Sequence, residues 1–275
     1  MRAFWLGLVG VVFAAAALSA CKKSPPSIRT PPPLKVAAAA DLASAFKDVG
    51  EAYEKKTGQP VTFSFGSTGL LEKQIAEGAP YDVFAAANVS YADDAVKAGA
   101  CFAETKSLYA TGRLVMWTKN DEALPLSLEG LADPKFKKIA IANPEHAPYG
   151  TAAKQALTKV GVWSAVSSRI VYGENVQQTL AFAQSGNAEV AIVALSLALT
   201  ADGKYTAIDA SLYDRIDQAL VVCKGGAGKD ASAPSEPAKA FTAFVGSPDG
   251  HAIMRRHGFL MPGEATTSGD AGALR

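Results

Sequence analysis

The chain has 275 residues, and its 27 Lys and Arg against 26 Asp and Glu give a formal net charge of +1. Without a basic excess or a basic stripe, the sequence argues against a nucleic-acid partner. The chain begins with Arg2 and an almost wholly apolar run from Phe4 to Leu18. This run is short for a membrane span and small residues follow it, so we predict that residues 1–20 are an export signal peptide.

A cysteine follows this segment directly, in the tetrapeptide Leu18-Ser19-Ala20-Cys21. The tetrapeptide resembles the lipobox of bacterial lipoproteins, which implies that Cys21 is lipidated and anchors the protein to a membrane. The alternative is cleavage by the ordinary signal peptidase, with Cys21 incidental. Residues 22–33 hold five prolines and no apolar periodicity, so we expect residues 21–33 to form an extended tether.

From Leu34 onward, short apolar runs alternate with amphipathic helical segments. This alternation predicts an α/β fold with parallel sheets covered by helices. Asp41 stands as an expected N-cap before a helix that ends at Gly58. The runs expected to form strands are 34–40, 61–65, 81–87, 112–118, 138–142, 170–172, 190–194 and 218–223.

The pattern of strands and helices occurs twice, before and after about residue 113. The strand that ends at Cys223 is expected to return from the second module to the first, which gives two lobes joined by two crossing strands. We therefore expect lobe one to comprise residues 34–112 and 221–262, and lobe two residues 113–220. Residues 263–275 are small and polar, and we expect them to be a disordered tail.

Two further cysteines, Cys101 and Cys223, form a possible pair in an exported protein. Nothing in their spacing requires a disulfide, and both lie in apolar contexts where a buried free thiol is as plausible. The sequence leaves both alternatives open.

The stretch from Val61 to Ile75 reads as a strand, the turn Gly66-Ser67-Thr68-Gly69 and a helix. A helix start presents unpaired backbone N–H groups, and here two hydroxyls lie beside them, so the turn is a candidate oxyanion site. Taken alone, the turn fits an ordinary helix cap better, because such Ser and Thr caps are common. Four further turns follow expected strands at matching positions, and they converge on a cleft between the lobes: Ala40-Asp41-Leu42, Pro148-Tyr149-Gly150, Glu174-Asn175-Val176 and Ala194-Leu195-Ser196.

These motifs make the resemblance specific: the chain looks like the periplasmic molybdate-binding proteins of ABC transporters over about residues 34 to 262. The matching segments are AAADL at 38–42, SFGSTG at 64–69, QIAEGAPYDVF at 74–84, IANPEHAPYG at 141–150, GENVQQ at 173–178 and RRHGF at 255–259. The resemblance implies a bilobed type II periplasmic-binding fold that closes on molybdate or tungstate.

The resemblance also implies the biological setting. The protein would be a monomer on the periplasmic side of a bacterial membrane, deliver its ligand to an ABC transporter permease, and be neither an enzyme nor the holder of a cofactor. Molybdenum would be present only as molybdate, bound through its oxygen atoms.

Carried over position by position, the family's ligand residues match Asp41, Thr68 with Ser67 beside it, Tyr149 and Val176. Asp41 departs from the hydroxyl residue often found there, and an ionised carboxylate repels a dianion. We expect Asp41 to turn its side chain back to cap its own helix and to offer only its N–H. Many members place a Tyr where this chain has Ala194, so we expect the Tyr149 phenol to substitute, with Ser196 as a weaker substitute or a helix cap.

Two other functions stay open. Asp41 would favour a protonated oxyanion such as phosphate, and sulfate is a further possible ligand. A serine-type hydrolase that uses Ser67, with His146 as its base, belongs to a different class, although the residues at 66–69 depart from the G-x-S-x-G pattern.

Overall fold

The computed structural model describes residues 31–119, 124–225 and 230–264. The predicted signal peptide, Cys21, the tether up to residue 30 and the tail from residue 265 lie outside the described residues. Glu264, which was predicted to lie in the tail, accepts hydrogen bonds from Arg255 and from the Met261 N–H. In the part of the chain that is described, no helix is long and apolar enough to cross a membrane.

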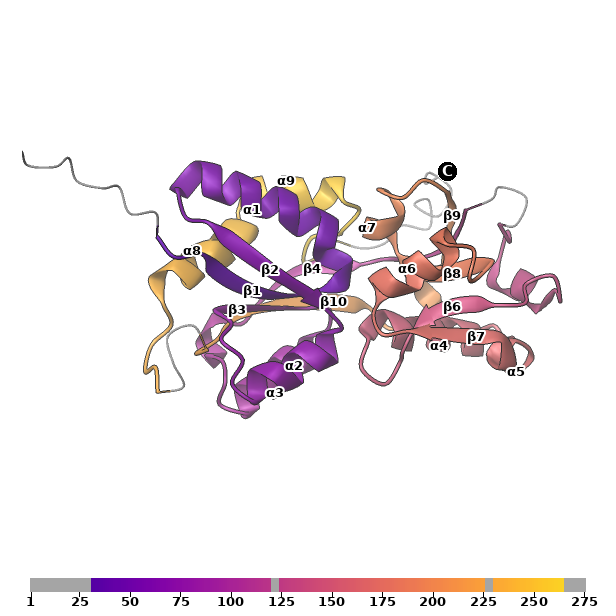
Figure 1. Ribbon diagram of the computed structural model, residues 1–275, viewed down its shortest axis with the longest axis horizontal. Helices are drawn as coiled ribbons and strands as arrows, with labels where there is room; N and C mark the ends of the chain where they lie inside the picture. Colours follow the sequence, from indigo (N-terminus) through magenta and orange to yellow (C-terminus); the bar gives the residue numbers. More distant parts are fainter. Residues whose placement is uncertain (1–30, 120–123, 226–229, 265–275) are drawn as a thin grey trace, which may run out of the picture. The chain divides into compact units, whose positions relative to one another are not determined.

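The described residues form two five-stranded sheets (Figure 1). Sheet one has the order β2-β1-β3-β10-β4 and sheet two the order β7-β6-β8-β5-β9. Sheet one consists of β1 (Leu34–Ala39), β2 (Val61–Gly66), β3 (Val83–Ala86), β4 (Ser107–Gly112) and β10 (Ile216–Val222). Sheet two consists of β5 (Leu114–Thr118), β6 (Ile139–Ala142), β7 (Ile170–Gly173), β8 (Val190–Ala194) and β9 (Lys204–Ala207). We call each sheet, with the helices packed on it, lobe one and lobe two.

The helices follow the strands in chain order, as the alternation in the sequence predicts. They are η1 (Ala40–Leu42), α1 (Ala43–Thr57), α2 (Thr68–Ala76), α3 (Val89–Lys97), α4 (Pro148–Lys159), α5 (Trp163–Val166), α6 (Val176–Gln184), α7 (Leu195–Ala198), α8 (Glu236–Val245) and α9 (Pro248–Arg256), with short 3-10 turns η2 (Ala103–Thr105), η4 (Leu128–Ala132), η5 (Ser167–Arg169) and η6 (Ala210–Leu212).

Strand β1 shows why lobe one has helices on both faces. Val36 and Ala38 belong to the large core cluster, whereas Ala37 points into a smaller cluster with Leu71 and Ile75 of α2. Successive side chains of a strand point to opposite faces, so an uninterrupted apolar strand must be covered twice. Figure 1 shows α1, α8 and α9 over one face of sheet one and α2 and α3 over the other.

The predicted bilobed α/β fold with two crossing strands is confirmed, although neither sheet is wholly parallel. Strand β10 runs antiparallel to β3 and β4, and β5 runs antiparallel to β8 and β9. Strands β4 and β9 were not predicted, because their short, mixed sequences lack a continuous apolar run. Strand β10 pairs with β4 from Ile216 onward, so we propose that the chain returns to lobe one at about that residue, ahead of the expected boundary at 220.

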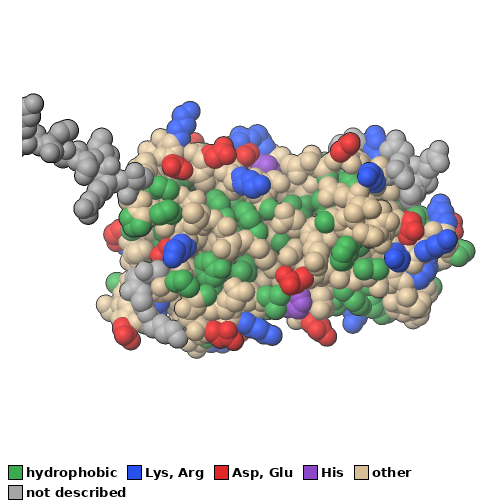
Figure 2. All heavy atoms as spheres, in the orientation of Figure 1, with side chains coloured by type: hydrophobic (Ala, Val, Ile, Leu, Met, Phe, Trp, Pro, Cys, Tyr) green, Lys and Arg blue, Asp and Glu red, His purple; other side chains and the backbone are tan. Residues whose placement is uncertain are grey.

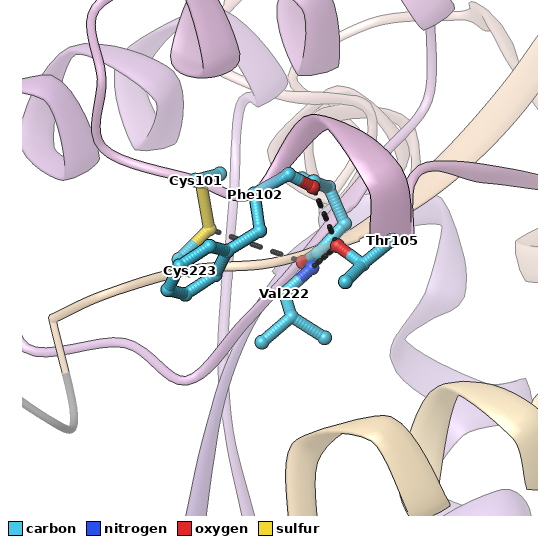
Figure 3. The surroundings of a disulfide bond; sticks show 6 residues. Cys101, Phe102, Thr105, Val222 and Cys223 are labelled. Atoms are coloured by element: carbon cyan, nitrogen blue, oxygen red, sulfur yellow. Dashed lines mark hydrogen bonds between the residues drawn. A yellow bond between two sulfur atoms is a disulfide. The ribbon is translucent and has the colours of Figure 1, made fainter. Parts of the chain in front are cut away.

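The two cysteines of lobe one form a disulfide, which settles the alternative that the sequence left open. Cys101 and Cys223 are bonded through their sulfur atoms and are separated by 122 positions in the sequence. Figure 3 shows the bond beside Thr105, whose hydroxyl donates to the Phe102 carbonyl and accepts from the Val222 N–H. The bond therefore ties the segment that precedes β4 to the end of β10.

The surface carries both signs of charge in small, interspersed groups. Figure 2 shows no stripe of Lys and Arg on the face that it displays. This distribution agrees with the nearly balanced composition.

Candidate functional site

A small cavity lies between the two lobes, where several helices begin. It is lined by Ala39, Ala40, Asp41, Gly66, Ser67, Thr68, Ala87, Ala147, Pro148, Tyr149, Asn175 and Val176. About 10 Å³ is open to the centre of a water-sized sphere, which is about the room that one ordered water needs. The cavity therefore suits a compact ligand and excludes a bulky organic one.

All five residues predicted to bind the ligand line this cavity: Asp41, Ser67, Thr68, Tyr149 and Val176. They lie at or next to the starts of four helices, namely η1, α2, α4 and α6. The first backbone N–H groups of a helix have no acceptor within the helix, and the helix dipole adds partial positive charge there. Among the described residues that line the cavity, none is Lys, Arg or His.

Thr68 and Ser67 occupy the start of α2, and their hydroxyls have different partners. The Thr68 hydroxyl oxygen lies 3.3 Å from the Ala87 N–H, which donates to it, so the Thr68 hydroxyl proton stays available for an acceptor in the cavity. The Ser67 hydroxyl lies 2.7 Å from both the His146 carbonyl oxygen and the His146 Nδ1. Thr68 is therefore better placed than Ser67 to donate to a ligand.

His146 connects the two lobes at the rim of the cavity. Its carbonyl oxygen accepts from the Gly69 N–H at 2.9 Å, in addition to the contact with Ser67. A side chain at Gly69 has no room, because its Cβ would lie 2.9 Å from that carbonyl oxygen. His146 thus holds lobe two against the first turn of α2.

Asp41 does not cap its own helix, contrary to the expectation from the sequence. It lies within η1, and α1 has no side-chain cap. Its Oδ2 instead accepts hydrogen bonds from the Tyr149 hydroxyl at 3.0 Å and from the Gln218 Nε2 at 2.5 Å. The carboxylate is 1% exposed, so the two neutral donors stabilise it in place of water.

This hydrogen-bonded group extends further into lobe one. The Tyr109 hydroxyl donates to the Gln218 Oε1 at 2.6 Å, and both side chains are buried. Burial raises the pKa of Asp41 from 3.8 to about 6, although the hydrogen bonds from Gln218 and Tyr149 oppose part of that rise. Burial together with the Asp41 carboxylate raises the pKa of Tyr149 well above its ordinary value, so the phenol stays protonated and donates.

Ser196 contacts Asp41 as well, but through the backbone. Its hydroxyl donates to the Asp41 carbonyl oxygen at 2.7 Å, and neither Ser196 nor Ala194 lines the cavity. The fifth predicted turn is therefore absent from the cavity wall, and Ser196 is neither a helix cap nor a direct lining residue. Tyr149 and Ser196 of lobe two both hold Asp41 of lobe one.

The position of Tyr149 depends on a glycine of β4. A Cβ at Gly112 would lie 2.0 Å from the Tyr149 hydroxyl oxygen.

We expect Gly112→Ala to lower the free energy of unfolding by about 2 kcal/mol, because the Tyr149 ring must leave its site. The cost should be smaller in a Tyr149→Phe background, as measured by urea unfolding of the four proteins in a double-mutant cycle. Equal costs in both backgrounds would show that the overlap with the hydroxyl is unimportant.

Sequence reasoning missed Gln218 and Tyr109. Gln218 is a polar residue in an otherwise apolar strand, and it is fully buried. Such a residue needs a buried partner, so its position was a usable signal. Which partner it takes was not visible, because Asp41 lies 177 positions away.

Comparison with known proteins places the chain in a family. Residues 34–260 match the model for the bacterial extracellular solute-binding protein family. The chain belongs to this family. The match covers both lobes.

Two relatives are similar to this chain over most of its length. It is 36% identical over 231 residues to the molybdate-binding protein ModA of Azotobacter vinelandii, covering 82% of this chain and 89% of the relative. It is 30% identical over 229 residues to a putative ABC transporter substrate-binding lipoprotein, YvgL, of Bacillus subtilis, covering 82% and 85%. The solved structure of the Azotobacter vinelandii periplasmic molybdate-binding protein superimposes with a TM-score of 0.75 at 30% identity, covering 83% of this chain and 99% of that one.

Proposed function

We propose that this protein is an extracytoplasmic solute-binding protein that captures molybdate or tungstate in the cavity between its lobes and delivers it to an ABC transporter permease. One observation carries the proposal: the starts of four helices from both lobes converge on a small, buried cavity. The comparison with molybdate-binding relatives supports the ligand's identity.

The ligand would be held through its oxygen atoms, with no protein group bound to the metal. The Thr68 hydroxyl and the N–H groups at the starts of η1, α2, α4 and α6 are the proposed donors. The Ser67 hydroxyl would join them only if its proton left the His146 carbonyl oxygen, to which it donates in this structure. Pre-aimed dipoles in a dry site bind an anion strongly without a full positive charge. Among the described residues, no group of three or more His, Cys, Asp or Glu is placed to hold a metal ion.

Binding would require the lobes to move. A tetrahedral oxyanion is larger than the water-sized space that the closed lobes leave. Rotation about the crossing strands would open the cleft, and closure would then form the bonds from His146, Tyr149 and Ser196 to lobe one. The permease would recognise the closed form.

The setting of the protein is part of the proposal. The resemblance of residues 18–21 to a lipobox and the lipoprotein relative support a lipid anchor at Cys21 on the periplasmic side of a bacterial membrane. We further propose that the protein acts as a monomer, carries no cofactor and catalyses no reaction.

Phosphate is the second candidate ligand, because a buried carboxylate lines the cavity. Hydrogen phosphate carries a proton that an ionised Asp41 would accept, whereas molybdate near neutral pH carries none.

The Ser67–His146 contact gives some geometric support to a hydrolase, but the family consists of binding proteins, so this function is less well supported.

Isothermal titration calorimetry with four anions tests the proposal. We expect molybdate and tungstate to bind in one-to-one complexes at least about 100-fold more tightly than sulfate or phosphate, because donors from both lobes line a small cavity and fix the size of anion that it holds. Phosphate binding without molybdate binding would replace the proposed ligand. Ester hydrolysis that is lost in Ser67→Ala would contradict the proposed class of protein.

A further inference from the structure

Asp41 is the unusual feature of this cavity, because an anion site contains a carboxyl group and lacks a countercharge. Among the described lining residues, Asp41 is the only Asp or Glu. Its side-chain partners are a phenol and an amide, which are both neutral. When Asp41 is ionised, a bound dianion would therefore raise the charge enclosed by the two lobes to minus three.

The neighbouring elements supply no charge that would compensate. Helix η1 packs against α1, α6, α7 and β2, and α6, α7 and β2 contain no Asp, Glu, Lys, Arg or His. The Asp41 carboxyl group accepts its hydrogen bonds from Tyr149 and Gln218. The charged residues on α1 and on the elements that precede it or supply these partners are Lys47, Asp48, Glu51, Glu54, Lys55 and Lys56 on α1, Lys154 and Lys159 on α4, Lys35 on β1 and Asp217 on β10. The titratable groups that face Asp41 are Tyr109 and Tyr149.

Given the proposed function, we propose that Asp41 takes up one proton from solvent whenever the cavity binds a fully deprotonated oxyanion. The carboxylate becomes a carboxylic acid, and the enclosed charge stays at minus two. The new O–H is also a hydrogen-bond donor inside a cavity lined by other donors. Capture of the ligand and capture of a proton are therefore one event.

Two physical arguments make this uptake favourable. Two like charges in a dry cavity repel strongly, because little water screens them. Burial already raises the pKa of this carboxyl group to about 6 in the free protein, so its protonation near neutral pH costs less than that of an exposed Asp. The proton is thus gained at modest cost near neutral pH, and it removes a large repulsion.

A ligand that brings its own proton should behave differently. Hydrogen phosphate can donate its proton to the Asp41 carboxylate, so its binding needs no proton from solvent. The number of protons taken up from solvent thus distinguishes a fully deprotonated oxyanion from one that carries its own proton, and Asp41 is the group that receives the proton in both cases.

Calorimetry of the full chain in two buffers with different ionisation enthalpies measures this number directly. For molybdate at about pH 7.5, we expect about one proton to be taken up per ligand bound. We also expect the affinity to fall about tenfold for each pH unit above neutrality, since linkage gives a slope of one for one proton.

Asp41→Asn should take up no proton and should bind molybdate with an affinity that is nearly independent of pH. Asp249→Asn, which removes an exposed carboxylate paired with Lys56, is the matched control and should behave like the unaltered protein.

The outcomes separate this inference from the function on which it rests. If no oxyanion binds at any pH, the proposed function fails. If molybdate binds to the unaltered protein with no proton uptake and no pH slope, the function stands and the role of Asp41 is overturned. The measurement on the unaltered protein decides the matter even if Asp41→Asn does not fold.

Discussion

Thr68→Val should weaken molybdate binding by about 30-fold, more than the loss of any other single side-chain hydroxyl. This change corresponds to about 2 kcal/mol, which is typical of a hydrogen bond to a charged group. Thr68 is 1% exposed and its oxygen already accepts from the Ala87 N–H, so its hydroxyl proton is available to a ligand in the cavity. Valine keeps the shape of the side chain but cannot donate, and it also leaves the Ala87 N–H without that acceptor.

Calorimetric titration of Thr68→Val with molybdate measures the loss. Thr68→Ser, which keeps a hydroxyl, should restore most of the affinity. Thr158→Val is the matched control, because Thr158 is exposed on α4 and its hydroxyl donates to the Lys154 carbonyl, away from the cavity. A larger loss from Tyr149→Phe than from Thr68→Val would shift the main donor role to the phenol.

Removal of the disulfide should cause the largest loss of stability. We expect Cys101→Ala combined with Cys223→Ala to lower the free energy of unfolding by about 4 kcal/mol. The bond closes a loop of 122 positions, and a cross-link over so long a loop greatly restricts the unfolded chain. Both cysteines are buried, so alanine leaves small gaps that add to the loss.

Urea unfolding of the double variant and of the unaltered protein measures this effect. A reductant should lower the stability of the unaltered protein to slightly above that of the variant, because reduction leaves no gaps, and should leave the variant unchanged. Neither cysteine lines the cavity, so the folded variant should retain its affinity for molybdate. Equal stabilities in the oxidised and double-variant proteins would show that the bond contributes little.

The cavity wall was largely predictable from the sequence because its parts are local. A strand, a turn and a helix follow one another within about fifteen residues, and parallel strands end at the same edge of a sheet. Ser67, Thr68, Tyr149 and Val176 line the cavity for this reason, and their binding of the ligand stays a prediction.

The surroundings of Asp41 were not predictable by the same reasoning. An Asp before a helix usually caps it. Asp41 does not, because its carboxylate pairs with side chains from two segments that are distant in the sequence. Gln218 lies on the returning strand, and Tyr149 comes from the other lobe. Side-chain pairs between such segments depend on how the lobes close, which no local pattern records.

The position of β10 determines the order in which this protein can fold. The strands of sheet two all lie between Leu114 and Ala207, so that sheet contains every one of its strands before residue 216 is synthesised. In sheet one, by contrast, β10 lies between β3 and β4. Strand β4 pairs with β10, which follows it in the sequence by more than a hundred residues. Such distant contacts form slowly because the intervening chain must first be closed into a loop. Lobe two should therefore gain structure first, while lobe one completes its sheet last, when the inner strand β10 is added between β3 and β4.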